Sequence, residues 1–160
     1  MNSTDYKNLL LKTAVAAISC DGDIDDREIE ELKNIEKSSA YFSSEDLSKT
    51  LEKSLIKCKK DTEKYINSIF SEIKKSKLNI LQEMTLIEIS LRIILADEKE
   101  EDSEKKFISS LRKNLNLTDF LIHQRFGSID YLGIYYQQEE FTDIIENNSN
   151  NIENTETKNK

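Results

Sequence analysis

Proline is absent from this chain of 160 residues, and glycine occurs only three times. These two residues are the strongest breakers of helices, so their scarcity leaves few interruptions to helical structure. Leu, Ile, Lys, Glu and Ser are abundant instead, which favours helices and polar helix ends. The composition predicts an all-helical protein, and the length suits a single domain.

Cysteine and histidine are also scarce. Cys20 and Cys58 lie far apart, which does not indicate a disulfide framework or a thiolate zinc cluster. His123 is the single histidine, and no Ser or Cys nucleophile stands at a recognisable spacing from it. Phosphate loops, dinucleotide-binding fingerprints and nucleophile elbows are missing as well. We therefore expect free thiols and no enzymatic activity.

A long apolar run is missing too. The most apolar stretch, 86–96, is too short to cross a bilayer and contains Glu88 and Arg92. The apolar N-terminal stretch is interrupted by Lys12 and lacks a basic leader, which predicts a core helix rather than a signal peptide. The formal net charge of −8 disfavours nucleic acid and anionic membranes as partners. We expect a cytoplasmic protein that suits cations or basic protein surfaces.

Apolar residues recur at helical spacing through most of the chain. The predicted helices are one ending near Cys20, one from Asp25 to before Ser38, one opened by Ser43 or Asp46 and reaching Cys58, one opened by Asp61 or Thr62, one over 80–96, one carrying Phe107 to Leu115, one from the cap Thr118 to Gly127, and one or two after Tyr131. This makes a bundle of about seven to eight helices. The helix over 80–96 is apolar on nearly every face, so we place it at the centre.

Two polar segments stand apart from this pattern. Residues 49–77 hold nine lysines and four acidic residues, which we interpret as a solvated basic face with a negative partner as the alternative. After Glu146 only one of fourteen residues is apolar, too few to offset the entropy of ordering them. The helical domain therefore covers 1–145, and 146–160 is predicted to be a disordered polar tail.

An acidic turn, "SCDGDIDDREIEEL", follows the first predicted helix. Asp25 as cap and Glu28 three residues later form a capping-box pattern, and Gly22 suits a left-handed helix end, so one interpretation needs no ligand. The other interpretation is a site for a hard cation, because crowded aspartates repel one another unless something offsets their charge. A free-standing EF-hand fits poorly. With Gly22 at loop position 6, Ala17 occupies the first ligand position, and a loop starting at Asp21 puts Leu32 at the last.

The acidic turn has a second copy 76 residues later. Asp21 corresponds to Asp97, and Glu28 to Glu104, while apolar positions match apolar positions around them. The repeat predicts two helix–acidic turn–helix halves, and a cation held between both turns is more plausible than one held by either alone. The candidate ligands for Ca²⁺ or Mg²⁺ are Asp21, Asp23, Asp25, Glu28, Asp97, Glu101 and Glu104.

An apolar helix ending in "CDGDIDDREIEEL", with a second copy in "LADEKEEDSEKKFISSL", resembles the TerB-like domain of tellurite-resistance and stress-response proteins. The matching segments are 14–36 and 87–117. In the second copy Glu98 replaces the glycine and Glu100 the isoleucine. The resemblance implies an all-helical, cytoplasmic, non-catalytic bacterial module. It also implies a divalent cation at the acidic turns, with Asp21 and Glu28 as ligands and Asp97 and Glu104 as their partners, and assembly with other stress-response or phage-defence proteins.

A cluster of aromatic residues near the C-terminus supports a different function. Tyr131, Tyr135, Tyr136 and Phe141 suit core packing by default, and a partner-binding surface is the alternative. Together with the charge polarity and the capping roles of the acidic residues, this cluster is compatible with a metal-independent adaptor that uses Tyr131 and Tyr135. In both hypotheses a protein partner is expected, and the oligomeric state stays open.

Overall fold

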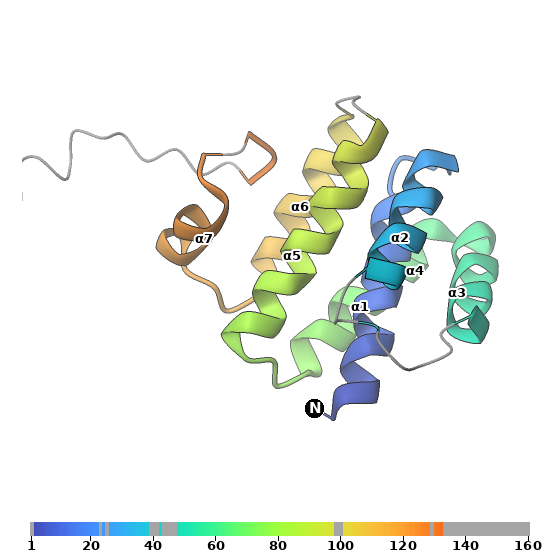
Figure 1. Cartoon of the computed structure of the whole chain (residues 1–160), viewed down its shortest axis with the longest axis horizontal. Coiled ribbons are helices and arrows are strands. Elements are labelled where there is room, and N and C mark those ends of the chain that lie inside the picture. Colours follow the sequence, from blue (N-terminus) through green and yellow to red (C-terminus); the bar gives the residue numbers. More distant parts are fainter. Residues whose placement is uncertain are drawn as a thin grey trace, which may run out of the picture.

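A computed structural model describes residues 2–22, 24, 26–38, 42, 48–97, 101–128 and 130–132, without the side chains of Ser38 and Asp97. Throughout these residues the chain forms helices and no strand (Figure 1). The elements are α1 Ser3–Ile18, α2 Asp26–Ser38, α3 Ser48–Lys60, α4 Thr62–Lys75, α5 Ile80–Ile94, η1 Leu95–Asp97, α6 Asp102–Lys113, α7 Asp119–Phe126 and η2 Asp130–Leu132, the two η elements being single 3₁₀ turns. The prediction of an all-helical single domain is confirmed.

Local capping signals set several helix ends. The side chain of Asp61 accepts a hydrogen bond from the backbone N–H of Lys64 at 3.0 Å, so α4 begins where it was predicted. Thr118 caps α7 in the same way, and Gly127 ends that helix with a positive φ of 72°. The predicted caps Ser43 and Asp46 and the predicted tail 146–160 lie outside the described residues.

The core is organised around α1 and α5, which come from the two halves of the chain. These helices pack extensively against each other, with α3 and α4 on α1, and with α2 and α6 on α5 (Figure 1). The buried residues of α5 cover most of its circumference, as the sequence predicted for a central helix. Near the start of both helices the Tyr6 hydroxyl donates to the Gln82 carbonyl oxygen at 2.9 Å. Among the described helices, none combines the length and apolar character that crossing a membrane requires.

Polar contacts attach α7 and the loop before it to this core. The buried carboxylate of Glu83 on α5 accepts hydrogen bonds from the backbone N–H and the side-chain amide of Asn116, both at 3.0 Å. The guanidinium of Arg125 on α7 pairs with Glu88 of α5 at 2.8 Å. The Glu83 contact is the more consequential of the two, because its carboxylate is buried and these two hydrogen bonds compensate for the water it has lost.

Replacing Glu83 with glutamine should lower the free energy of unfolding by about 1 to 2 kcal/mol. Glutamine has one acceptor oxygen, so its NH₂ group faces one of the two Asn116 donors. The matched control is Glu88→Gln on the same helix, which breaks a partly exposed ion pair and should cost less than about 1 kcal/mol. Urea unfolding followed by circular dichroism measures both. Equal losses in the two variants would contradict this role for Glu83.

Candidate functional site

The first acidic turn has a backbone shape that depends on Gly22. Helix α1 ends at Ile18, and the Gly22 N–H donates to the Ser19 carbonyl oxygen at 3.1 Å. Gly22 has a φ of 90°, a conformation that other residues adopt only with strain. A Cβ atom at this position would meet nothing within 4 Å, so the constraint lies in the backbone and not in available space. Gly22 thus lets the chain turn from α1 towards α2.

The structure repeats this arrangement in the second half. Helix α1 ends at Ile18 and α5 at Ile94, while α2 begins at Asp26 and α6 at Asp102. Both boundaries are therefore displaced by the 76 residues that relate the two acidic turns in the sequence. Glu28 and Glu104 consequently occupy the same place, the third residue of the helix that follows each turn. The predicted helix–turn–helix repeat is present in the fold.

Packing places the two turns at the same end of the molecule. Helices α1 and α5 run side by side in about the same direction (Figure 1), and η1, at the end of α5, contacts α2. Glu28 and Glu104 are both buried there, with only 6% and 4% of their surface exposed. Burying a carboxylate is costly unless hydrogen bonds or opposite charge compensate for the lost water. Two buried carboxylates therefore stand at equivalent positions of the two halves, at the same end of the molecule.

Hydrogen bonds hold Glu104 in place. Its Oε2 accepts the backbone N–H of Glu101 at 3.0 Å, as a capping box requires, and the hydroxyl of Tyr131 at 3.3 Å. Tyr131 is buried in η2, and the ammonium of Lys105 lies 5.6 Å from the centre of its ring. The carboxylate therefore has a defined orientation beside the turn.

The thiol of Cys20 is affected by acidic residues of both halves. Burial raises the pKa of its thiol far above the ordinary value of 9.0, and the negative charges of Glu104, Asp21 and Glu28 raise this pKa further. Carboxylates from both repeats therefore act on the same half-buried thiol. The thiol stays protonated at neutral pH, which makes it a poor nucleophile.

The predicted site residues are only partly described. Asp21 and Glu101 are exposed at the turns, whereas Glu28 and Glu104 are buried. Asp23, Asp25 and the side chain of Asp97 lie outside the described part of the chain, as does Tyr135. Within that part, no group of three or more histidine, cysteine or carboxylate side chains is arranged to hold a metal ion. The carboxylates of Glu28 and Glu104 fit a hard cation in kind, without supplying a full set of ligands.

Sequence reasoning missed two neighbours of these carboxylates. The sequence alone indicates only a free thiol at Cys20, although this residue directly precedes Asp21 in the acidic turn. The contact between Tyr131 and Glu104 had no signal in the sequence, because it depends on how η2 packs against α6. Cys20 and Tyr131 are thus both neighbours of the buried carboxylates, Tyr131 by a hydrogen bond to Glu104 and Cys20 by its interaction with Glu28 and Glu104.

These features define a class of all-helical protein with two helix–acidic turn–helix units, whose buried glutamates lie at one end. The model of the family described as tellurite resistance protein TerB matches residues 9–124, more than half of the chain. The chain belongs to the TerB family, which confirms the resemblance found in the sequence. Membership implies a role related to tellurite resistance or stress. Comparison with curated proteins and with solved structures gives no match.

Proposed function

We propose that this chain is a non-catalytic TerB-family module that binds a divalent cation, Ca²⁺ or Mg²⁺, at its two acidic turns. It would act in a bacterial stress-response or phage-defence assembly. The observation that carries the proposal is the burial of Glu28 and Glu104, which stand at equivalent positions of the two repeats and at the same end of the molecule. Hard cations prefer oxygen ligands of this kind.

The charge around the pair supports a cation in particular. Glu28, Glu104 and the exposed Asp21 all place negative charge near Cys20. Charges of one sign that are gathered in a partly buried place destabilise the fold, and a bound divalent ion removes that repulsion. Neither turn has enough oxygen donors for a full shell, so the proposal needs both halves. The sequence candidates Asp23, Asp25, Asp97 and Glu101 would supply further ligands.

Isothermal titration calorimetry with Ca²⁺, Mg²⁺, Mn²⁺ and Zn²⁺ tests this proposal. We expect Ca²⁺ or Mg²⁺ to bind the full chain, and Zn²⁺ to bind less well because thiolate and imidazole ligands are lacking. The double variant Glu28→Gln with Glu104→Gln should weaken binding by about 100-fold, since it removes both buried charges. Glutamine still completes a capping box, so the helices should keep their ends.

The control is a second double variant that removes two negative charges at exposed positions instead of buried ones. Glu30→Gln with Glu63→Gln should leave the affinity unchanged, because both side chains point to solvent. Paramagnetic Mn²⁺ gives the location: it should broaden the amide NMR signals of Gly22 and of Glu104 together. Absence of heat with every ion, or equal binding by both double variants, would refute cation binding at the turns.

A metal-independent adaptor that uses Tyr131 and Tyr135 is the alternative function. The Tyr131 ring is buried in the core with its hydroxyl on Glu104, so a partner surface at this segment would depend mainly on Tyr135, which lies outside the described residues. The two functions differ in their response to a chelator. Capture of a protein partner that persists in EDTA would favour the adaptor, whereas capture that EDTA abolishes would favour the cation-dependent module.

A further inference from the structure

A polar groove of about 530 Å³ lies where α1, α3 and α4 meet. A second hollow of about 330 Å³ continues it between α3 and α4, and both are lined by Lys57, Tyr65 and Ser68. We refer to the two hollows together as the lysine groove. Its volume is in the range of small-molecule sites. No acidic-turn residue lines either hollow, so the groove is separate from the candidate cation site.

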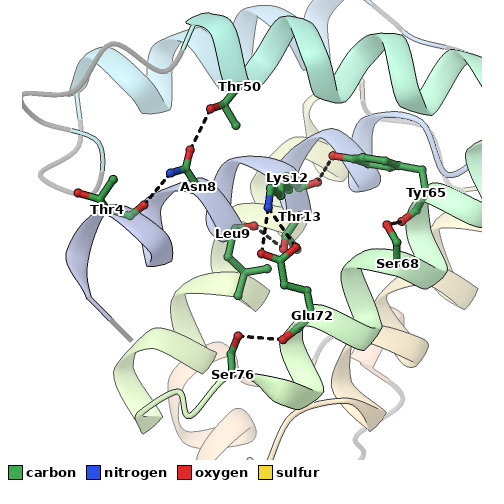
Figure 2. Close-up of polar contacts among 10 residues, drawn as sticks. All are labelled: Thr4, Asn8, Leu9, Lys12, Thr13, Thr50, Tyr65, Ser68, Glu72 and Ser76. Atoms are coloured by element: carbon green, nitrogen blue, oxygen red, sulfur yellow. Dashed lines mark hydrogen bonds and ion pairs between the residues drawn. The ribbon is translucent and has the colours of Figure 1, made fainter.

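The walls of the lysine groove are held by hydrogen bonds between helices (Figure 2). Thr50 of α3 donates to the Asn8 side-chain oxygen at 2.9 Å. The Lys12 ammonium of α1 contacts both carboxylate oxygens of Glu72 on α4, at 2.9 and 3.1 Å. The buried Tyr65 hydroxyl donates to the Lys12 carbonyl oxygen at 3.1 Å. A ligand would therefore meet a groove whose shape is already formed, which lowers the entropic cost of binding.

Charge is unevenly distributed along the groove. At one end Glu72 neutralises Lys12. At the other end Lys57, Lys60 and Lys64 face a single carboxylate, that of Asp61, which caps α4 by accepting the Lys64 backbone N–H. Across the described residues, no ion pair engages the ammonium groups of these three lysines. This end of the groove is positive in a chain whose net charge is −8.

Helix stability explains only part of this cluster. Lys57 and Lys60 lie in the last turn of α3, where positive charge favours the helix dipole. Lys64 lies in the first turn of α4, where positive charge opposes it. The position of Lys64 therefore has a cost for its own helix, and an anion between the two helices would offset that cost.

We propose that the lysine groove binds a small organic phosphate ester. The phosphate lies among Lys57, Lys60 and Lys64, whose ammonium groups supply charge and donors to its oxygens. The polar body lies along the groove beside Ser68 and Thr50, whose hydroxyl groups line it and can form hydrogen bonds with a ligand. A long polyanion such as nucleic acid is disfavoured, since the rest of the molecule is acidic.

NMR titration of the full chain in EDTA, with ribose 5-phosphate as the probe, tests this proposal. We expect saturable shifts of the Thr50, Lys57 and Ser68 amides, about tenfold weaker binding of inorganic phosphate, and no shifts with ribose. Lys57→Gln with Lys64→Gln should weaken binding of ribose 5-phosphate by about tenfold. The control, Lys74→Gln with Lys75→Gln, makes the same charge change on exposed residues outside the groove and should bind normally.

Several results would overturn the proposal. Equal weakening in the two lysine variants, or equal affinity for inorganic phosphate and ribose 5-phosphate, would show general attraction of anions to surface lysines. Stronger binding of an acidic peptide than of ribose 5-phosphate would assign the groove to a protein partner instead. Thermal unfolding confirms that each variant is folded. EDTA keeps divalent ions out, so failure here is distinct from failure of cation binding at the acidic turns.

Discussion

Raising the pH from 9 to 11 is expected to lower the free energy of unfolding by about 4 kcal/mol. Burial, with the charges of Glu104, Asp21 and Glu28, holds the pKa of Cys20 far above its ordinary value of 9.0. Burial also raises the pKa of Tyr65 from 10.0 to about 12. In this pH range the unfolded chain loses protons that the native protein keeps. Each group therefore lowers the free energy of unfolding by about 1.4 kcal/mol for every pH unit between its unfolded and its native pKa. Below about pH 9 both groups are protonated in both states, and the free energy of unfolding is not reduced by either of them.

Two variants separate the contributions of these groups. Cys20→Ala should flatten the decline that begins near pH 9, and Tyr65→Phe should flatten the part that begins near pH 10. Each variant is compared with its own stability at pH 8, because both substitutions also change packing or hydrogen bonding. Urea unfolding of the reduced protein at several pH values gives the slopes. If the free energy of unfolding of both variants declined with pH as steeply as that of the wild type, the attribution of this decline to Cys20 and Tyr65 would be contradicted.

Replacing Ile87 with alanine is expected to lower the free energy of unfolding by about 3 to 4 kcal/mol. Ile87 is 0% exposed on α5, the helix on which α1, α2 and α6 all pack. Removing most of its side chain forfeits apolar burial and leaves a cavity that the rigid neighbouring helices fill incompletely. Urea unfolding followed by circular dichroism measures the loss.

The control for this prediction lies on the same helix. Leu81 is 78% exposed, so Leu81→Ala should change the free energy of unfolding by less than about 0.5 kcal/mol. Leucine and alanine have similar helix propensities, so the comparison isolates burial. A loss in Leu81→Ala that matches the loss in Ile87→Ala would contradict a core built around α5.

Much of this fold could be predicted from the sequence because its signals are local. The apolar spacing located the helices, and caps such as Asp61 and Thr118 located their starts within a residue. The 76-residue repeat of the acidic turns also appears at the helix ends themselves. A further local signal lies at the start of α5, where Asn79 and Gln82 form a reciprocal capping box with bonds of 2.9 and 3.0 Å.

The candidate site was less predictable because it depends on contacts between distant segments. The sequence paired Glu28 with Glu104 by repeat, yet their burial at one end follows from the packing of α1 along α5. Spacing alone does not show that Cys20 adjoins a glutamate of the other half. The lysine groove likewise requires Lys12 and Glu72, 60 residues apart, to meet.

The packing of α1 on α5 also has a consequence for the order in which the chain matures on the ribosome. Helices α3 and α4 can cover one face of α1 as soon as they emerge, but the face that receives α5 must wait for residues 80–94. Until then the apolar side chains on that face have no partner within the nascent chain. A product that terminates before Ile80 therefore exposes an apolar surface to chaperones and proteases, and the stable native core forms only after the second half is synthesised.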